Sequence, residues 1–419
     1  MNAAPRIQHV GLLSEDGSAG FMSDLTFNGG LIGAKLGNQQ FTIRNVTFNG
    51  CVTAIEQLWN WGFTYQGISI NNCQKGFDLT TNGTSKAGSV VILDTSITNT
   101  PIGIISSYDP AGQVTVGSLI LENIQLNNVP IAIQDYNSSS TLLSGTTCIT
   151  IIQAWGQGHQ DIPNSPHTFQ GPMTPNTRPA SLLNPDAKFY TQSKPRYESE
   201  PLSSFLSVRA AGARGDGKTD DTTALQTIIN TAAKEGKIVF FDAGTYLITT
   251  TLHIPPGSRI IGETYPVILS SGPFFNDIQN PKPVIQVGNP GDTGHVEWGD
   301  MIVSTQGTQA GAILIEWNLS SPAASPSGIW DVHTRIGGFT GSQLTVNECP
   351  KSPGNGDVNA KCIAAYMSMH ITPSASGLYL ENNWFWTADH DIDAPGNPQI
   401  SVYAGRGVLV ESQEGNIWL

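Results

Sequence analysis

A short alternation of apolar and polar residues recurs along the first third of the chain. In each frame two residues that are usually apolar flank one variable residue. Asn follows the second apolar residue, either directly or after one more residue. The frames occupy residues 25–28, 46–49, 68–71, 95–99 and 124–127, and their second apolar residues are Phe27, Phe48, Ile70, Ile97 and Leu126. Alternation over so few residues is typical of a short strand with one buried face.

The spacing of these frames predicts the architecture. Successive second apolar residues are 21, 22, 27 and 29 positions apart. One strand per step predicts a solenoid in which each strand pairs with the strand of the preceding coil. Leucine-rich repeats have a fixed period and propeller blades repeat nearer 40 residues, so the drifting step favours a parallel β-helix. Asn at the repeated corner predicts side-chain amides bonded from coil to coil.

The pattern stops near residue 160 and begins again after residue 207. Residues 160–207 are rich in Pro and Ser and predict an ordered or semi-rigid linker. A tight turn at 213–221 precedes a helix that we expect to start at Thr222, capped by Asp220 or Asp221, and to end at Gly236. The apolar face of this helix contains Ala224, Leu225, Ile228, Ile229 and Ala232. We therefore expect an all-β fold with one β-helix lobe in 1–159, a linker in 160–207 and a second lobe in 208–419, whose helix caps its open end.

Composition and charge restrict the partners. Charged residues make up only 13% of the 419 residues, and the net charge is −13. An acidic surface disfavours nucleic acid, anionic membranes and polyanionic ligands, so a neutral polymer is the expected partner. No apolar run is long enough to span a bilayer, and the first residues have no signal-peptide pattern. Glycosylation sequons at Asn45, Asn82, Asn137 and Asn318 nevertheless favour a secreted protein.

Several longer segments resemble known proteins. GDGKTDDTTALQ at 215–226, followed by FFDAGTYLI at 240–248, resembles the opening of a pectate-lyase-like β-helix domain. That opening is specific for the fold but is shared by lyases, hydrolases and phage tailspikes. Residues 20–74, 328–344, 378–393 and 402–413 together resemble glycoside hydrolase family fifty-five, the fungal exo-β-1,3-glucanases, in order along nearly the whole chain.

The resemblance implies a right-handed parallel β-helix with two tandem lobes, each with its own Gly-Asp-Gly opening. Only the second opening is present here, so we expect the chain to be truncated at both ends, with a signal peptide lost from the missing N-terminal part. The implied activity is exo-acting hydrolysis of β-1,3-glucan with inversion, in a cleft between the lobes. The implied protein is a secreted monomer without a cofactor.

Inverting hydrolysis needs a general acid and an activated water. The carboxylate-rich zone contains Glu381, Asp389, Asp391, Asp393, Glu411 and Glu414. We favour Glu411 as the acid, because it ends the apolar run 408–410 where a strand would deliver it to a turn; an acid beyond Leu419 is the alternative. Ser23 matches the family's serine that holds the water, and its glutamine partner would lie before Met1.

Candidate substrate-binding residues are the aromatic and polar side chains near these carboxylates. Tryptophans two apart, as at Trp384 and Trp386 or Trp59 and Trp61, place both rings on one strand face, where pyranose rings stack. Burial in a core or cap is the alternative, and it weighs equally for Trp61. Asp389 and Asp391 would share a strand face with His390 opposite. Arg406, between two glycines, would bond sugar hydroxyls or pair with one of these aspartates.

The five cysteines lack metal-site spacing, and no metal site is expected. Cys349 and Cys362 flank a Gly-rich loop and predict a disulfide. Cys51 and Cys73 occupy matching positions one coil apart, which predicts either a stacked pair of thiols or a disulfide. A pectate-lyase-like polysaccharide lyase and a non-catalytic glucan-binding β-helix remain as alternative functions.

Overall fold

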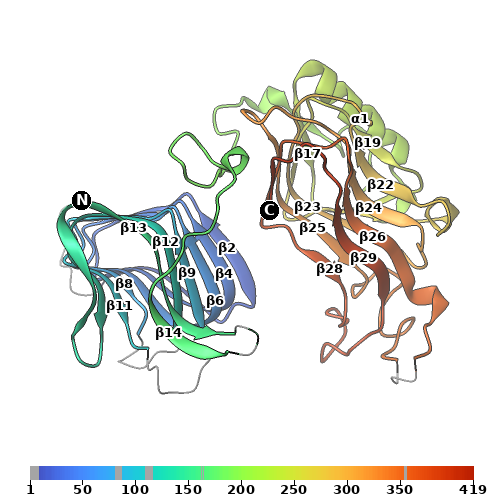
Figure 1. Cartoon of the computed structure of the whole chain (residues 1–419). Coiled ribbons are helices and arrows are strands. Elements are labelled where there is room, and N and C mark those ends of the chain that lie inside the picture. The colour runs from blue at the N-terminus through green and yellow to red at the C-terminus, as the bar shows by residue number, and fades with distance from the viewer. Residues whose placement is uncertain (1–8, 81–86, 109–116, 162, 164, 353–355) are drawn as a thin grey trace. The chain divides into compact units, whose positions relative to one another are not determined.

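The computed structural model describes residues 9–80, 87–108, 117–161, 163, 165–352 and 356–419. The chain divides into two compact units, which we call unit 1 and unit 2. Unit 1 comprises Met1–Pro179 and Pro185–Phe189, and unit 2 comprises Ala180–Asn184 and Tyr190–Leu419. Each unit is a stack of mostly parallel strands around its own apolar core (Figure 1). The predicted parallel β-helix architecture is confirmed. Within the described residues, no helix is long and apolar enough to cross a membrane.

Unit 1 is built from a 14-stranded sheet that winds around its core. Its strands are β1 (Val10–Glu15), β2 (Ala19–Ser23), β3 (Thr26–Asn28), β4 (Ile32–Arg44), β5 (Thr47–Asn49), β6 (Thr53–Gln66), β7 (Ser69–Asn71), β8 (Lys75–Asp78), β9 (Ser89–Leu93), β10 (Ser96–Thr98), β11 (Ile102–Ser106), β12 (Ser118–Asp135), β13 (Thr141–Gln160) and β14 (His167–Pro172).

The predicted repeat sets the register of unit 1. Strands β3, β5, β7, β10 and β12 pair in parallel, with Phe27 opposite Phe48, then Ile70, Ile97 and Leu126. The rings of Phe27 and Phe48 stack with centroids 5.0 Å apart. All five residues therefore form one column along the axis, because the same face of each short strand meets the core in every coil.

The expected amide ladders are present at the corners. Asn49 Nδ2 donates to Asn28 Oδ1 at 2.9 Å, and Asn71 Nδ2 donates to Asn49 Oδ1 at 3.1 Å. In a second ladder, Asn99 Nδ2 donates to Asn72 Oδ1 and Asn128 Nδ2 donates to Asn99 Oδ1, both at 3.0 Å. Those three residues have positive φ angles of 49–55°, a conformation that Asn tolerates better than most residues do.

Antiparallel pairing ends unit 1 in a way the repeat did not predict. Strand β13 pairs antiparallel with β12, and β14 pairs antiparallel with β13. Since β14 lies inside the range 160–207, that range is not a linker throughout. Phe169 and its neighbours on β14 continue the sheet of unit 1 instead.

Unit 2 contains an 11-stranded and a 5-stranded sheet. Its elements are η1 (Ala180–Leu182), η2 (Leu202–Ser204), β15 (Phe205–Ser207), β16 (Asp216–Asp220), α1 (Thr222–Glu235), β17 (Ile238–Phe241), β18 (Thr245–Ile248), β19 (Leu252–Ile254), β20 (Arg259–Gly262), β21 (Val267–Ser270), η3 (Pro273–Phe275), β22 (Lys282–Val287), β23 (Glu297–Thr305), β24 (Ala312–Trp317), β25 (Ser327–Ile336), η4 (Ala360–Cys362), β26 (Ile363–Ile371), β27 (Leu378–Glu381), β28 (Phe385–Thr387), β29 (Tyr403–Val410) and β30 (Ile417–Trp418).

The helix of unit 2 begins and ends as predicted. Asp221 occupies the N-cap position, but its buried carboxylate accepts hydrogen bonds from the backbone N–H groups of Arg214 and Gly215 and does not cap the helix. Asp220 accepts from the backbone N–H of Thr222 at 3.0 Å. Gly236 follows the last helical residue with φ of 64°, the left-handed conformation that ends many helices. The buried face of α1 packs on the core of unit 2.

Candidate functional site

A pair of tryptophans, Trp384 exposed and Trp386 half-buried, marks the outer face of the 11-stranded sheet in unit 2. Trp384 precedes β28 and Trp386 lies within it, so their side chains leave the same strand face, as predicted. Their rings stack with centroids 4.8 Å apart and an interplanar angle of 14°. Trp384 is 57% exposed. This flat aromatic surface is suited to the apolar face of a sugar ring.

The neighbouring strand β25 supplies polar partners to this pair. Its outward residues Asp331, His333 and Arg335 alternate with buried Val332 and Thr334. The Arg335 guanidinium lies 6.0 Å from the centroid of Trp386 and 4.6 Å from that of Phe339. His333 and Arg335 were not predicted as site residues from the sequence, although their alternation with apolar residues in DVHTRI was a usable signal.

His333 connects β25 to the tryptophans. Its Nδ1 accepts a hydrogen bond from the backbone N–H of Trp384 at 3.0 Å, so the proton of the neutral ring is on Nε2. Burial lowers the pKa of His333. The ring is therefore neutral at pH 7, and it stacks on Tyr265 with centroids 5.2 Å apart.

A row of polar corner residues borders the aromatic face. Asp300, Asp331 and Asn382 have φ angles of 54–59° and occupy equivalent corners of successive coils. Lys194 Nζ contacts both aspartates, at 2.8 Å from Asp331, and Asn382 donates to Asp331. Burial opposes the charge of Lys194, but its hydrogen bonds to the two aspartates outweigh burial and raise its pKa.

The loop after β28 corrects the prediction for Asp389 and Asp391. These residues lie outside a strand and do not share a face: Asp389 is exposed, whereas Asp391 is 3% exposed. Asp391 accepts from the backbone N–H of Val346 at 3.0 Å and so holds the loop. Asp389 pairs with His390 Nδ1 at 3.0 Å, and this hydrogen bond lowers the pKa of Asp389.

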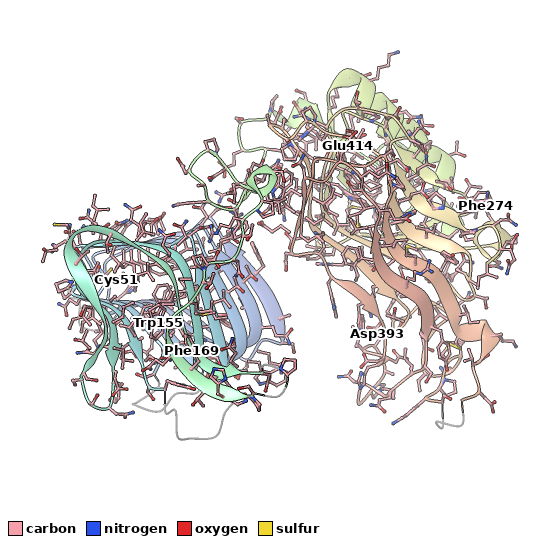
Figure 2. All side chains as sticks on the ribbon, in the orientation of Figure 1. Cys51, Trp155, Phe169, Phe274, Asp393 and Glu414 are labelled. Carbon is pink, nitrogen blue, oxygen red and sulfur yellow. A yellow bond between two sulfur atoms is a disulfide. The ribbon has the colours of Figure 1, made fainter. Side chains whose placement is uncertain are left out.

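An open hollow lies beside this loop. It has a volume of about 330 Å³ and is lined by Thr340, Gly341, Gln343, Thr345, Val346, Asn347, Glu348, Asp391, Asp393 and Ala394. Asp393, labelled in Figure 2, accepts from the backbone N–H of Thr340 at 2.8 Å. Hydroxyl, amide and carboxylate groups share the lining about equally with apolar surface, so the hollow suits a ligand that has both polar and apolar faces.

Glu411 lies on the other sheet of unit 2. It follows β29, the last strand of the 5-stranded sheet, and its Oε2 is 2.7 Å from His370 Nε2. The carboxylate is 48% exposed. Arg406 is an exposed residue of β29, and no ion pair joins it to Asp389 or Asp391 among the described contacts. The carboxylate-rich zone of the sequence is therefore divided between two sheets.

The candidates in unit 1 occupy strand ends and outer faces. Ser23 is the half-buried last residue of β2, paired in register with Arg44. Trp61 on β6 is 61% exposed. Trp59 is more covered, and its Nε1 donates to Glu15 at 3.2 Å.

The structure decides both predictions of cysteine pairing. Cys349 and Cys362 form the predicted disulfide. Cys51 and Cys73 are buried free thiols, so the disulfide alternative for this pair is wrong and the stacked alternative holds. Their contact and burial raise the pKa of Cys51. Cys148 is exposed on β13.

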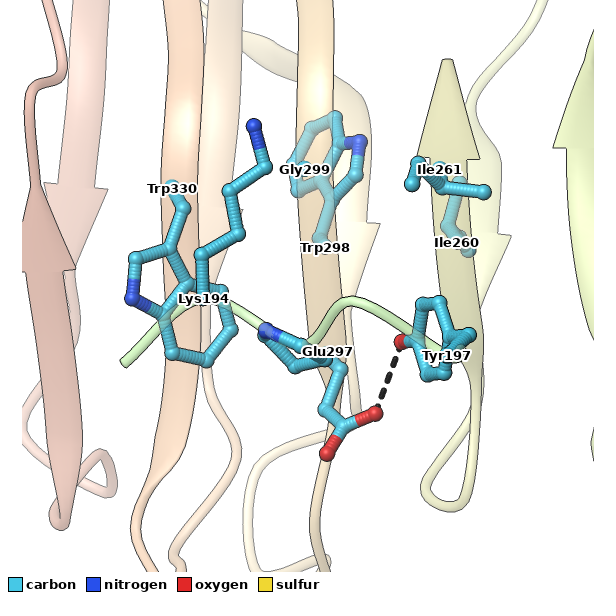
Figure 3. A pocket seen from close by; sticks show the side chains of 9 residues that line it. Lys194, Tyr197, Ile260, Ile261, Glu297, Trp298, Gly299 and Trp330 are labelled. Carbon is cyan, nitrogen blue, oxygen red and sulfur yellow. Dashed lines mark hydrogen bonds between the residues drawn. The ribbon is translucent and has the colours of Figure 1, made fainter. Parts of the chain in front are cut away.

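A second, small pocket lies under the chain segment 194–197 in unit 2 (Figure 3). Its volume of about 10 Å³ holds about one water and no sugar ring. Tyr197 donates to Glu297 at 2.7 Å, and His295 lies 3.3 Å from the same carboxylate. Burial raises the pKa of Glu297, but these two hydrogen bonds outweigh it and lower the value. The hydrogen bond from Tyr197 to Glu297 attaches the segment to the sheet.

The coils, the Gly-Asp-Gly turn and the exposed aromatic face together define a pectate-lyase-like parallel β-helix protein with a surface suited to carbohydrate. Consistently, the family model "Rhamnogalacturonase A/epimerase, pectate lyase-like" matches residues 1–78 and 205–320.

Comparison with known proteins narrows this class. The chain is 46% identical, over 100% of its length and 52% of the relative's, to a "Glucan 1,3-beta-glucosidase" of Cochliobolus carbonum. It is 35% identical, over 98% of its length and 57% of the relative's, to a "Probable glucan endo-1,3-beta-glucosidase" of Arthroderma benhamiae. The chain is related over nearly its full length to these fungal glucanases, as the motifs predicted. It spans about half the length of these curated relatives.

One solved structure also aligns with most of the chain. It is sacteLam55A from Streptomyces sp. SirexAA-E, with 14% sequence identity, a TM-score of 0.34, and coverage of 94% of this chain and 67% of that chain. At this identity and TM-score, the structural similarity supports no conclusion beyond those from the sequence comparisons.

Proposed function

We propose that this chain carries a glycoside hydrolase activity that removes glucose from the end of β-1,3-glucan chains with inversion. The observation that carries the proposal is its 46% identity, over its full length, to a glucan 1,3-beta-glucosidase. The stacked Trp384–Trp386 surface supports a sugar ligand, and the net charge of −13 favours a neutral polymer. Fungal glucan is an extracellular material, so we also propose that the protein acts as a secreted enzyme.

Named residues take roles in this proposal. Glu411 would protonate the leaving oxygen, and Ser23 would position the attacking water. The exposed side chains of Trp384, Asp389, Arg406 and Trp61 would bind the sugar, together with the half-buried Trp386 and His390. Asp391 is left out, because its carboxylate is buried and bonded to the backbone of Val346.

The first experiment is incubation of the purified chain with laminarin, followed by product analysis. Exo-acting inversion predicts glucose as the first product, initially as the α-anomer in a proton NMR time course. Longer oligosaccharides at early times would indicate endo cleavage, in line with the name of the second relative. Unsaturated, ultraviolet-absorbing products would establish a lyase, and retention of laminarin without product would establish a binding protein.

The Glu411→Gln variant tests the proposed acid. Loss of a general acid lowers kcat by about 10²–10⁴-fold. Glu414→Gln is the matched control, because Glu414 is an exposed carboxylate three positions further on. A Glu411→Gln enzyme with the wild-type kcat would exclude Glu411 as the acid.

A further inference from the structure

The aromatic surface of unit 2 extends beyond the tryptophan pair. Tyr265 lies at the corner before β21, His333 lies on β25 and Trp384 lies before β28. Tyr265 is 40% exposed and Trp384 is 57% exposed. Tyr265 stacks on His333 with an interplanar angle of 27°, and His333 accepts the backbone N–H of Trp384. The three residues form a connected row, which we call the aromatic strip.

The strand register explains why these residues meet. Ile302 on β23 pairs with Val267 on β21 and with His333 on β25. Thr334 pairs with Phe385, so the residues before them, His333 and Trp384, lie at the same level of neighbouring coils. The strip therefore runs across the strands, along the axis of the stack.

Tyr265 reaches the strip because of its backbone conformation. Its φ angle is 60°, in the left-handed region that tyrosine rarely adopts. From this corner, its ring contacts His333, which lies two coils further along the sheet. The strained corner thus places an aromatic ring in an exposed position, whereas the packing of the core does not require it there.

The chemistry of the strip fits a neutral sugar chain. Aromatic faces stack on the apolar faces of pyranose rings. The corner residues Asp300, Asp331 and Asn382 run beside the strip and carry groups that bond hydroxyls. The neutral His333 ring keeps one N–H on Nε2 as a further donor.

We propose that Tyr265, His333 and Trp384 bind successive glucose units of a β-1,3-glucan chain outside the position where its terminal bond is cleaved. The inference rests on the proposed function and deepens it, because it assigns the contacts that select long chains. The rings of Tyr265 and His333 are 5.2 Å apart, and Trp384 lies one coil step of about 4.8 Å further along the stack. The strip is therefore longer than one pyranose ring and contacts more than one sugar. Short oligosaccharides would not reach its whole length.

The test is electrophoresis of the full chain in native gels that contain laminarin, with Tyr265→Asn as the variant. Asn removes the ring but tolerates the left-handed corner, so the backbone need not change. Tyr136→Asn is the control, because Tyr136 is an equally exposed tyrosine in unit 1, at 45%. His333→Ala is the second variant, and thermal unfolding verifies that each variant is folded.

We expect Tyr265→Asn and His333→Ala to weaken laminarin retardation by about two- to tenfold, the range that an aromatic contact supplies. The control and the binding of laminaribiose, measured by calorimetry, should be unchanged. Wild-type retardation that persists in both folded variants would overturn the strip while leaving the proposed function intact. A wild-type chain that neither binds nor hydrolyses laminarin would overturn both.

Discussion

Side-chain amides decide much of the local structure of this protein, and four of them also lie in glycosylation sequons. Asn45 is exposed, but its Nδ2 donates to Asp24 at 2.5 Å. Asn318 is 1% exposed and donates to Gly288 and Glu316. Asn137 is exposed at the turn between β12 and β13. Asn82 lies outside the described residues. Among the described sequons, the asparagine is therefore exposed at Asn45 and Asn137 and buried at Asn318.

A secreted chain should carry a glycan at Asn137 and none at Asn318. A glycan is bulky and hydrophilic, so a buried, hydrogen-bonded amide cannot carry one in the folded protein. Expression in a fungal host followed by enzymatic deglycosylation in heavy-oxygen water and peptide mass spectrometry reports the occupancy of each sequon. An unmodified Asn137 peptide together with a glycosylated Asn318 peptide would contradict the expectation. The Asn137→Gln variant, which lacks this sequon, is the negative control.

At the scale of elements, the segment that follows β14 is fastened by ion pairs to buried acids. Arg178 lies 2.6 Å from Asp94 and 2.7 Å from Glu122, which are 2% and 4% exposed. Lys194 contacts Asp300 and Asp331 in unit 2 in a similar manner. Ion pairs from Arg178 and Lys194 therefore hold the range 160–207 against the two sheets. The Pro and Ser content of this range did not predict these ion pairs.

Arg178→Met should destabilise unit 1 strongly. Removing the cation leaves two buried carboxylates with only neutral hydrogen-bond donors, which costs about 3–5 kcal/mol. Hydrogen exchange at the most protected amides of β12 measures the change, and we expect exchange roughly a hundredfold faster or more. Arg196→Met is the control, since Arg196 and Glu198 are exposed and 3.5 Å apart, and it should cost less than about 1 kcal/mol. Equal exchange rates in the two variants would show that the Arg178 contacts add no stability.

At the scale of the whole molecule, charge separates the candidate ligands. The chain has 20 basic and 33 acidic residues, which gives the net charge of −13. Such a surface repels polyanions, whereas binding of a neutral glucan involves little long-range electrostatics.

Laminarin retardation in gels should therefore change by less than about twofold between low and high ionic strength, because salt screens only charge interactions. Polygalacturonate gels at low salt should not retard the chain. Retention by polygalacturonate that disappears with added salt would instead favour the lyase alternative.

The sequence by itself determined the features that depend on neighbouring residues. The alternation around Phe27, Phe48, Ile70, Ile97 and Leu126 determined where the strands lie. Because one frame occurs in each coil, it also determined that these residues form one column. Asp220 before the first turn of α1 and Gly236 after its last turn likewise determined where this helix begins and ends. The two cysteines that flank a Gly-rich loop predicted the disulfide. These features are local, or repeat with the coil, and are therefore visible in one dimension.

Only the tertiary structure decided which side chains meet across coils. Tyr265 and His333 are 68 positions apart, and their contact depends on the register of three strands and on one left-handed corner. The division between an exposed Asp389 and a buried Asp391 depends on a loop that folds against Val346. Loop lengths vary from coil to coil, so sequence spacing does not fix such neighbours; the stacking of the coils does.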